Sequence, residues 1–153
     1  MKGIKILCVG KIKEKYFSEG VQYYLRMIRK KYPIEILECP DEPTPDRASA
    51  AEENLIKVTE GQRLLQKIQP EDYVIALAID GKHYDSDSWQ VHLQQCSCQV
   101  QGYLVFVIGG SLGLSREVEH RSNEKLSFSA MTFPHQMMRM ILCQQLAEFS
   151  KHD

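Results

Sequence analysis

Three segments of this chain are apolar at almost every position, and each is followed by glycine or aspartate: residues 4–9, 73–79 and 103–108. Strands with apolar side chains on both faces are typical of a parallel sheet that helices cover on its two sides. The segments between them carry apolar residues at helical spacing, as Val21 and Leu25 do. This alternation over 153 residues predicts one α/β domain with a mainly parallel sheet.

Local signals predict the remaining elements. Two shorter strands are expected over residues 34–38 and 126–128. Three prolines within residues 40–46 predict a surface loop, and Asp80-Gly81-Lys82 predicts a turn. The expected helices cover residues 15–31, 48–68, 86–95, 117–121 and 134–149.

The composition points to an ordinary globular protein. Hydrophobic residues make up 43% of the chain, but no apolar run approaches the ~20 residues that a membrane span needs. The N-terminus enters strand-like sequence directly, without the apolar core of a signal peptide. We therefore expect a cytoplasmic protein that does not contact a membrane.

Cysteines and acidic residues offer two possible metal sites, and we expect neither to bind. The five cysteines have no paired C-x-x-C spacing, so free thiols in a reducing compartment are the favoured interpretation. Cys96-Ser97-Cys98 could also be a metal or redox pair, with only His92 near it in sequence. Asp80, Asp85, Asp87 and His83 match no known metal spacing and fit a polar turn.

Positive charge is concentrated at the N-terminal end. The net charge is −1, yet residues 1–31 hold nine lysines and arginines against two glutamates, and residues 35–60 are acidic. Such asymmetry is compatible with a surface that faces a polyanion such as RNA. The solvated face of an amphipathic helix is an equally good interpretation.

Two loops at strand ends predict a ligand pocket. Residues 109–113, Gly-Gly-Ser-Leu-Gly, fail the dinucleotide-binding pattern because Ile108 stands where its first glycine belongs, and no P-loop lysine follows. A tight structural turn remains an alternative. Residues 127–134 are small and hydroxyl-rich and lead into a helix whose first turn carries Pro134. Because open α/β sheets bind ligands at the carboxyl ends of their strands, both loops are candidates.

His135 and Arg139 are the candidate catalytic residues. They lie one helical turn apart, so they are expected on one face near the start of the last helix, where they would suit an anionic or polar substrate. A structural role for the histidine stays open. The same helix is apolar nearly all round, at Met137, Met138, Ile141 and Leu142, which predicts a second partner surface and hence a homodimer.

The order and spacing of the motifs resemble one family over residues 2–145. The chain is similar to the bacterial RlmH family, the ribosomal large-subunit RNA pseudouridine N3-methyltransferases of the SPOUT (trefoil-knotted) superfamily. The motifs that carry the resemblance are Gly10-Lys11, Glu60-Gly61-Gln62-Arg63, Gly81-Lys82, the loop from Phe106 to Leu114, and the stretch from Ser127 to Arg139.

The resemblance implies a SPOUT-type methyltransferase domain over residues 1–153, with a C-terminal trefoil knot and a homodimer packed through the knot and the last helix. It implies S-adenosylmethionine as the cofactor and ribosomal RNA as the partner, with no metal. His135 and Arg139 would then assist removal of the N3 proton, and the basic N-terminal region would contact phosphates. Carried over by position, the cofactor would contact Leu77, Gly109, Gly110, Ser129, Ala130, Met131, Thr132, Phe133 and Pro134.

The C-terminal segment departs from the family pattern. Members continue with an Arg-Ala-aromatic segment and a Gly-x-Pro-Tyr-His ending, whereas residues 143–153 match neither. We expect this chain to bind the cofactor without efficient methyl transfer. The alternative function is therefore a non-catalytic RNA- or ribosome-associated protein, and a nucleotide-binding oxidoreductase is a third.

Overall fold

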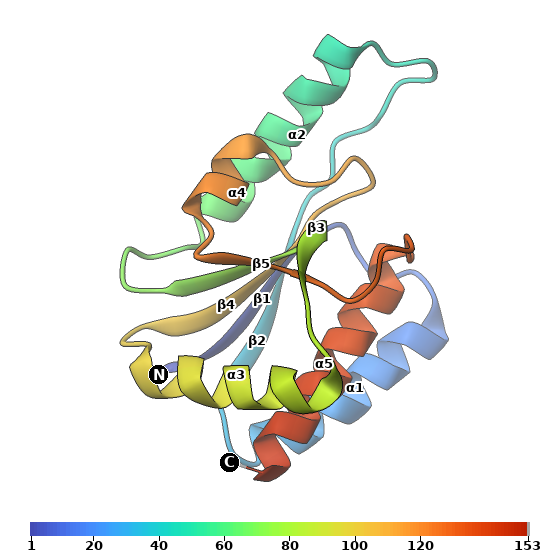
Figure 1. The fold of residues 1–153 in the computed structure, drawn as a ribbon. Coiled ribbons are helices and arrows are strands. Elements are labelled where there is room, and N and C mark those ends of the chain that lie inside the picture. Colours follow the sequence, from blue (N-terminus) through green and yellow to red (C-terminus); the bar gives the residue numbers. More distant parts are fainter. Residues whose placement is uncertain (153) are drawn as a thin grey trace.

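A computed structural model describes residues 1–152 and shows five parallel strands with five helices (Figure 1). Every predicted helix and strand is present, with most bounds shifted by one to four residues. The strands are β1 (Gly3–Val9), β2 (Ile34–Cys39), β3 (Tyr73–His83), β4 (Tyr103–Ile108) and β5 (Glu124–Ser127). The helices are α1 (Lys15–Arg29), α2 (Ala50–Leu65), α3 (Ser86–Gln99), α4 (Arg116–Arg121) and α5 (His135–His152).

The strands lie in the order β2-β1-β4-β3-β5, and all neighbouring pairs are parallel. The prediction that residues 80–82 turn the chain is wrong, because β3 continues to His83. Leu77 and Lys82 both pair with Leu126, so the residues between them bulge out of the ladder. Ile79, which we expected to be buried, is 54% exposed on this bulge.

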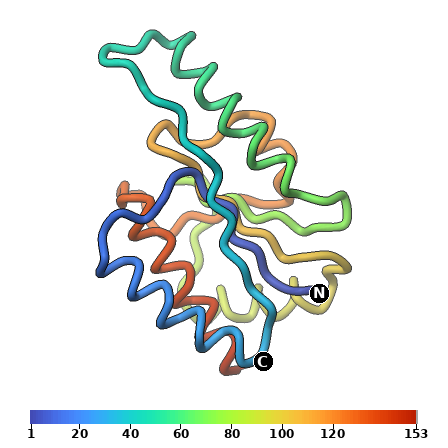
Figure 2. Tube along the Cα trace, turned by 180° about the vertical axis from the view of Figure 1, so that it is seen from behind, coloured from blue at the N-terminus to red at the C-terminus, as the bar shows by residue number. Residues whose placement is uncertain are grey.

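Alternation of side chains along each strand divides the core into two layers. On one face, Ile6 and Phe106 pack in the cluster beneath α1, α3 and α5. On the other face, Leu7 and Val107 pack with Leu64 of α2 and Val118 of α4. Figures 1 and 2 show the same division from opposite sides, with α1 and α5 side by side and α2 projecting beyond the sheet. Since β4 is buried on both sides, its continuous apolarity is explained.

More of helix α5 is buried within the monomer than its sequence suggested. Leu142 is 0% exposed, so it belongs to the monomer core and cannot form the dimer surface that we expected of it. Met137, Met138 and Ile141 remain partly exposed and are the only members of that predicted surface still available. The homodimer and the trefoil knot stay predictions.

No helix among residues 1–152 is both long and apolar enough to cross a membrane.

Candidate functional site

A cavity of about 750 Å³ lies at the carboxyl ends of β4 and β5, beside the middle of β3. This volume is within the range of roughly 300–1,000 Å³ that small-molecule sites occupy. Both loops singled out from the sequence line it, together with Leu77 and Ala78 of β3 and Met138 of α5. The structure thus brings together three segments that are separated in sequence by up to about sixty residues.

The glycine loop (residues 109–113) is a tight turn as well as a wall of this cavity. The Gly113 N–H donates to the Gly110 carbonyl over 3.0 Å, which closes the turn. Gly113 has a φ of +88°, a conformation that side-chain-bearing residues rarely adopt. A Cβ on Gly109 would lie 2.9 Å from Leu114 Cδ2 and 3.0 Å from the Gly113 carbonyl group, so a larger residue would require these neighbours to shift. The glycines therefore let bare backbone form one side of the cavity.

The serine loop (residues 127–134) forms the opposite side. The Ser127 hydroxyl donates to the Ser129 carbonyl over 2.9 Å, and Ser129 Oγ accepts from the Met131 N–H over 3.0 Å. Small hydroxyl residues thus shape the loop by local hydrogen bonds. Eight of the nine residues predicted to contact the cofactor line the cavity, Gly109 and Gly110 on one side and most of the serine loop on the other. Ala130 does not line it, so the structure places Ala130 outside the predicted site.

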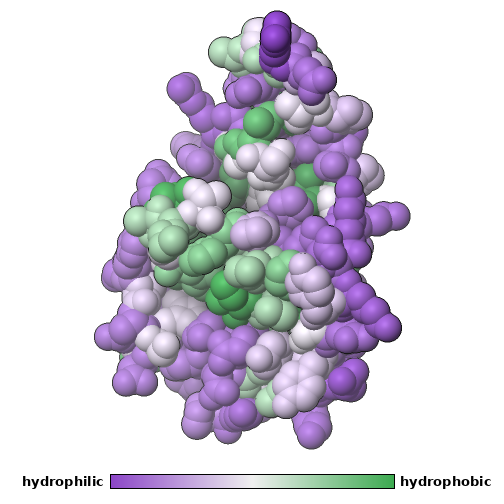
Figure 3. Space-filling model, turned by 90° about the vertical axis from the view of Figure 1, so that its right-hand side faces the viewer, coloured by the Kyte–Doolittle hydropathy of each residue, from purple (hydrophilic) through white to green (hydrophobic). Residues whose placement is uncertain are grey.

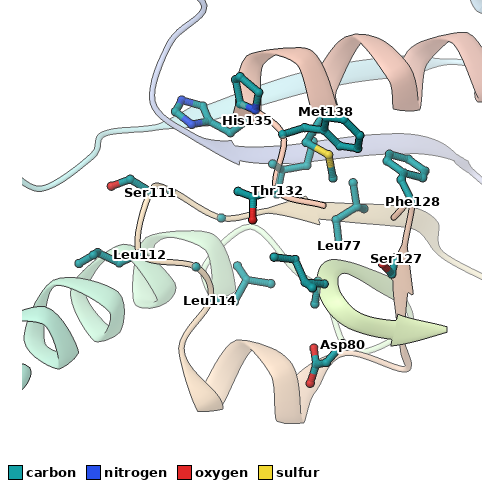
Figure 4. A pocket seen from close by; sticks show the side chains of 18 of the residues that line it. Leu77, Asp80, Ser111, Leu112, Leu114, Ser127, Phe128, Thr132, His135 and Met138 are labelled. Atoms are coloured by element: carbon teal, nitrogen blue, oxygen red, sulfur yellow. The ribbon is translucent and has the colours of Figure 1, made fainter. Parts of the chain in front are cut away.

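Figure 4 shows how the lining side chains are distributed. Thr132 and Leu77 lie near the middle, with Phe128 and Met138 beside them. His135 stands on one rim and Asp80 on the other. Asp80 is paired with Lys125, at 2.8 Å between Oδ2 and Nζ. The residues fit a nucleoside-type cofactor, because apolar side chains offer faces for a base and the glycine backbone allows close approach.

His135 begins α5 and lines the cavity. Burial lowers its pKa below the ordinary value of 6.5, and the charges of Arg139 and Lys13 lower it further, against a smaller opposing effect of Asp41. The imidazole is therefore neutral at pH 7 and can accept a proton.

Arg139 does not line the cavity, contrary to the expectation that it would share an exposed face with His135. Its side chain is 2% exposed and pairs with Glu38 at 2.6 Å between Nη1 and Oε2. Nη2 also donates to the Gly10 carbonyl over 3.3 Å. Arg139 therefore affects the site indirectly. Its charge lowers the pKa of His135, and its hydrogen bonds link α5 to the ends of β1 and β2.

Glu60 belongs to the motif Glu60-Gly61-Gln62-Arg63, and in the structure it lies under the glycine loop. It is 5% exposed, and its Oε2 accepts from the Glu42 N–H over 2.9 Å. A Cβ on Gly110 would lie 3.0 Å from Glu60 Oε1. The pKa of Glu60 is raised above its ordinary value, and burial is the largest cause. The sequence did not predict this contact, because a single glutamate that faces the protein interior forms no recognisable motif.

The basic region reaches the rim of the cavity. Gln136 at the start of α5 accepts from the backbone N–H groups of Lys13 and Glu14 over 2.9 and 3.2 Å. The β1–α1 connection, with Lys11 and Lys13 exposed, is thereby held beside His135. Cationic side chains next to the cavity would suit a polyanionic substrate.

The segment that departs from the family pattern continues α5 to His152, with Leu146 and Phe149 in the core. This placement does not bear on turnover, and inefficient methyl transfer stays a prediction.

Comparison with known proteins agrees with this geometry. Residues 1–148 match the family described as "Predicted SPOUT methyltransferase". The ribosomal RNA large subunit methyltransferase H of Streptococcus thermophilus (strain CNRZ 1066) is 46% identical over 143 residues, which cover 94% of this chain and 90% of that protein. The protein of the same name from Bacillus thuringiensis (strain Al Hakam) is 47% identical over the same shares.

One solved structure supports the fold alone. A probable methylase family protein from Haemophilus influenzae Rd KW20 aligns with a TM-score of 0.54 at 10% identity. The alignment covers 97% of this chain and 66% of that chain.

Proposed function

This chain belongs to the SPOUT methyltransferase family, and we propose that it methylates N3 of a pseudouridine in large-subunit ribosomal RNA, with S-adenosylmethionine as the methyl donor. The observation that carries the proposal is the cavity between the glycine and serine loops, with a neutral histidine on its rim. The names of the relatives supply the class of substrate. Because the substrate is ribosomal RNA, we place the protein in the cytoplasm.

The glycine loop, the serine loop and Leu77 would hold the cofactor. When bound, S-adenosylmethionine supplies a methyl group that is already activated as a sulfonium, so the protein has mainly to align the acceptor and exclude water. Phe128 and Met138 provide apolar surface that keeps water away from this position.

The acceptor nitrogen of a uracil-type ring carries a proton that must leave before or as the new bond forms. His135 is the residue on the rim that can take it, because its lowered pKa keeps the imidazole neutral. Lys11 and Lys13 would contact phosphates on either side of the target nucleotide. These roles follow from position and charge.

Two measurements test the proposal. Calorimetric titration with S-adenosylmethionine and with NADH compares the proposed cofactor with that of the oxidoreductase alternative. Transfer of labelled methyl groups to ribosomes that lack the modification, followed by mass mapping of the nucleotide, then tests the reaction. Binding of NADH in place of S-adenosylmethionine would refute the proposal. Binding without transfer to any ribosomal particle would support the non-catalytic alternative.

A further inference from the structure

A second cluster of ligating side chains lies away from the cavity. His92 and Cys96 come from α3, and Glu124 is the first residue of β5. Their ligand atoms all lie within 4.8 Å of one another. Within residues 1–152 this is the only group of three or more His, Cys, Asp or Glu residues so arranged. The acidic residues weighed in the sequence are not part of it, since Asp85 instead caps α3.

We propose that His92, Cys96 and Glu124 bind a zinc ion that ties α3 to β5. No metal was expected from the sequence, where Cys96 lies closer to Cys98 than to any other possible ligand. The spacing of His92 and Cys96 puts both on one face of α3, whereas Cys98 is exposed. The third ligand, the carboxylate of Glu124, lies 28 residues after Cys96 in the sequence.

The distances suit a tetrahedral ion. With Zn–N of about 2.0 Å and Zn–S of about 2.3 Å, two tetrahedral ligand atoms are about 3.5 Å apart. His92 Nε2 and Cys96 Sγ are 3.5 Å apart. Nε2 is 2.7 and 2.8 Å from the two Glu124 oxygens, so the flexible carboxylate has to move outward by about 0.5 Å to accept the ion. An imidazole, a thiolate and a carboxylate together favour zinc over calcium or magnesium.

Surrounding residues hold the ligands in place. The Tyr73 hydroxyl donates to Glu124 Oε2 over 2.6 Å, which orients the carboxylate. Tyr84 stacks on the His92 ring, with centroids 5.1 Å apart. A cavity of about 450 Å³, lined by His92, Cys96 and Tyr73, gives access from solvent and room for water as the fourth ligand.

Metal binding must displace one proton. Cys96 is a free cysteine, and the form of its side chain that binds zinc is the thiolate. The S–H bond breaks as the Zn–S bond forms, and the proton passes to solvent.

The site is separate from the proposed methyl-transfer site. Tyr73 and Glu124 begin their strands, whereas Leu77 in the middle of β3 and Ser127 at the end of β5 line the large cavity. Three to four residues of strand, at about 3.3 Å each, separate the two sites. The inference therefore stands whether or not the proposed reaction is correct.

Metal titration of the full chain tests the proposal. After chelator treatment, exchange into reducing buffer, addition of zinc and removal of the unbound excess, we expect one zinc per chain by elemental analysis. Cobalt is expected to give thiolate charge-transfer absorption and the strong visible bands of a tetrahedral site. Zinc should also raise the midpoint of thermal unfolding of the parent protein.

A graded set of variants separates this site from adventitious binding. Cys96→Ser should abolish the charge-transfer band, and Tyr73→Phe, which removes only an outer hydrogen bond, should weaken zinc binding about 10–100-fold. Cys98→Ser, on the same helix, is the control and should bind as the parent does. Glu124→Gln gives an independent test if Cys96→Ser does not fold. The proposal is wrong if the parent binds no zinc at micromolar concentration, or if Cys98→Ser loses the ion and Cys96→Ser retains it.

Discussion

At the scale of single residues, the proposed chemistry depends on His135. Replacing it with glutamine removes the proposed base but keeps a polar side chain at the start of α5. We expect methyl transfer to fall about 10²–10⁴-fold, the usual loss of a general base. Cofactor affinity should change little, because the glycine loop and Leu77 are untouched. Single-turnover rates on ribosomes and calorimetric binding would measure the two effects separately.

The pH dependence of the same step provides a second readout. Because the pKa of His135 is lowered from 6.5, the neutral form that accepts a proton predominates above that lowered value. The rate should therefore rise with pH along a limb whose midpoint lies below 6.5. His135→Gln should lose this limb. If the limb persists in the variant, another group accepts the proton.

Arg139 is a structural residue whose partner can be tested. In Glu38→Gln the buried guanidinium loses its charged partner, and its Nε already has no hydrogen-bond partner within residues 1–152. We expect a loss of about 1–3 kcal/mol in the free energy of unfolding by urea. Glu35→Gln, an exposed glutamate on the same strand, is the control and should stay within about 0.5 kcal/mol. Equal losses in the two variants would mean that the ion pair contributes nothing specific.

At the scale of elements, the serine loop offers one position for a test variant and a neighbouring position for its control. Thr132 and Ala130 are both exposed, but only Thr132 lines the cavity. An indole at position 132 would fill space needed by the cofactor, so Thr132→Trp should weaken S-adenosylmethionine binding tenfold or more, about 1.4 kcal/mol. Ala130→Trp should bind as the parent does. Calorimetry measures both.

The result for Ala130→Trp decides between the two placements of that residue. The resemblance assigned Ala130 to the cofactor, whereas the structure leaves it outside the cavity. A large loss of affinity in this variant, with an unchanged thermal midpoint, would show that the loop rearranges when the cofactor binds.

At the scale of the whole molecule, apolar side chains gather near the middle of one face (Figure 3). Among the exposed apolar residues, Met131 is 70% and Ile79 is 54% exposed, and both line the cavity. A contiguous exposed apolar surface is unusual for a monomer. The homodimer stays a prediction.

The dimer prediction is tested on the outer face of α5. Met137 and Ile141 lie one turn apart and are partly exposed, so charges there should oppose association without entering the core. We expect the parent to sediment as a dimer at micromolar concentration and Met137→Glu/Ile141→Glu as a monomer. Val91→Glu replaces a more exposed apolar residue on α3 and serves as the control. A monomeric parent would contradict the prediction, and so would a double variant that remains a dimer.

The sequence by itself determined the elements and the two loops of the candidate site. Helix and strand formation depend on local periodicity, which is why the predicted bounds of β4 match the structure at both ends. Glycine at position 113 and proline at position 134 mark backbone geometries that few other residues allow. The resemblance then connected the two loops to one cofactor.

Only the tertiary structure decided which distant residues meet. Arg139 was predicted to face the site, because nothing near it in sequence reveals a partner at Glu38, 101 residues away. The bulge in β3 depends on pairing with β5, and Glu124 reaches His92 only because β5 adds to the edge of the sheet beside β3. Such contacts are set by strand order and helix packing, which combine free energies from the whole chain, and a local pattern does not contain them.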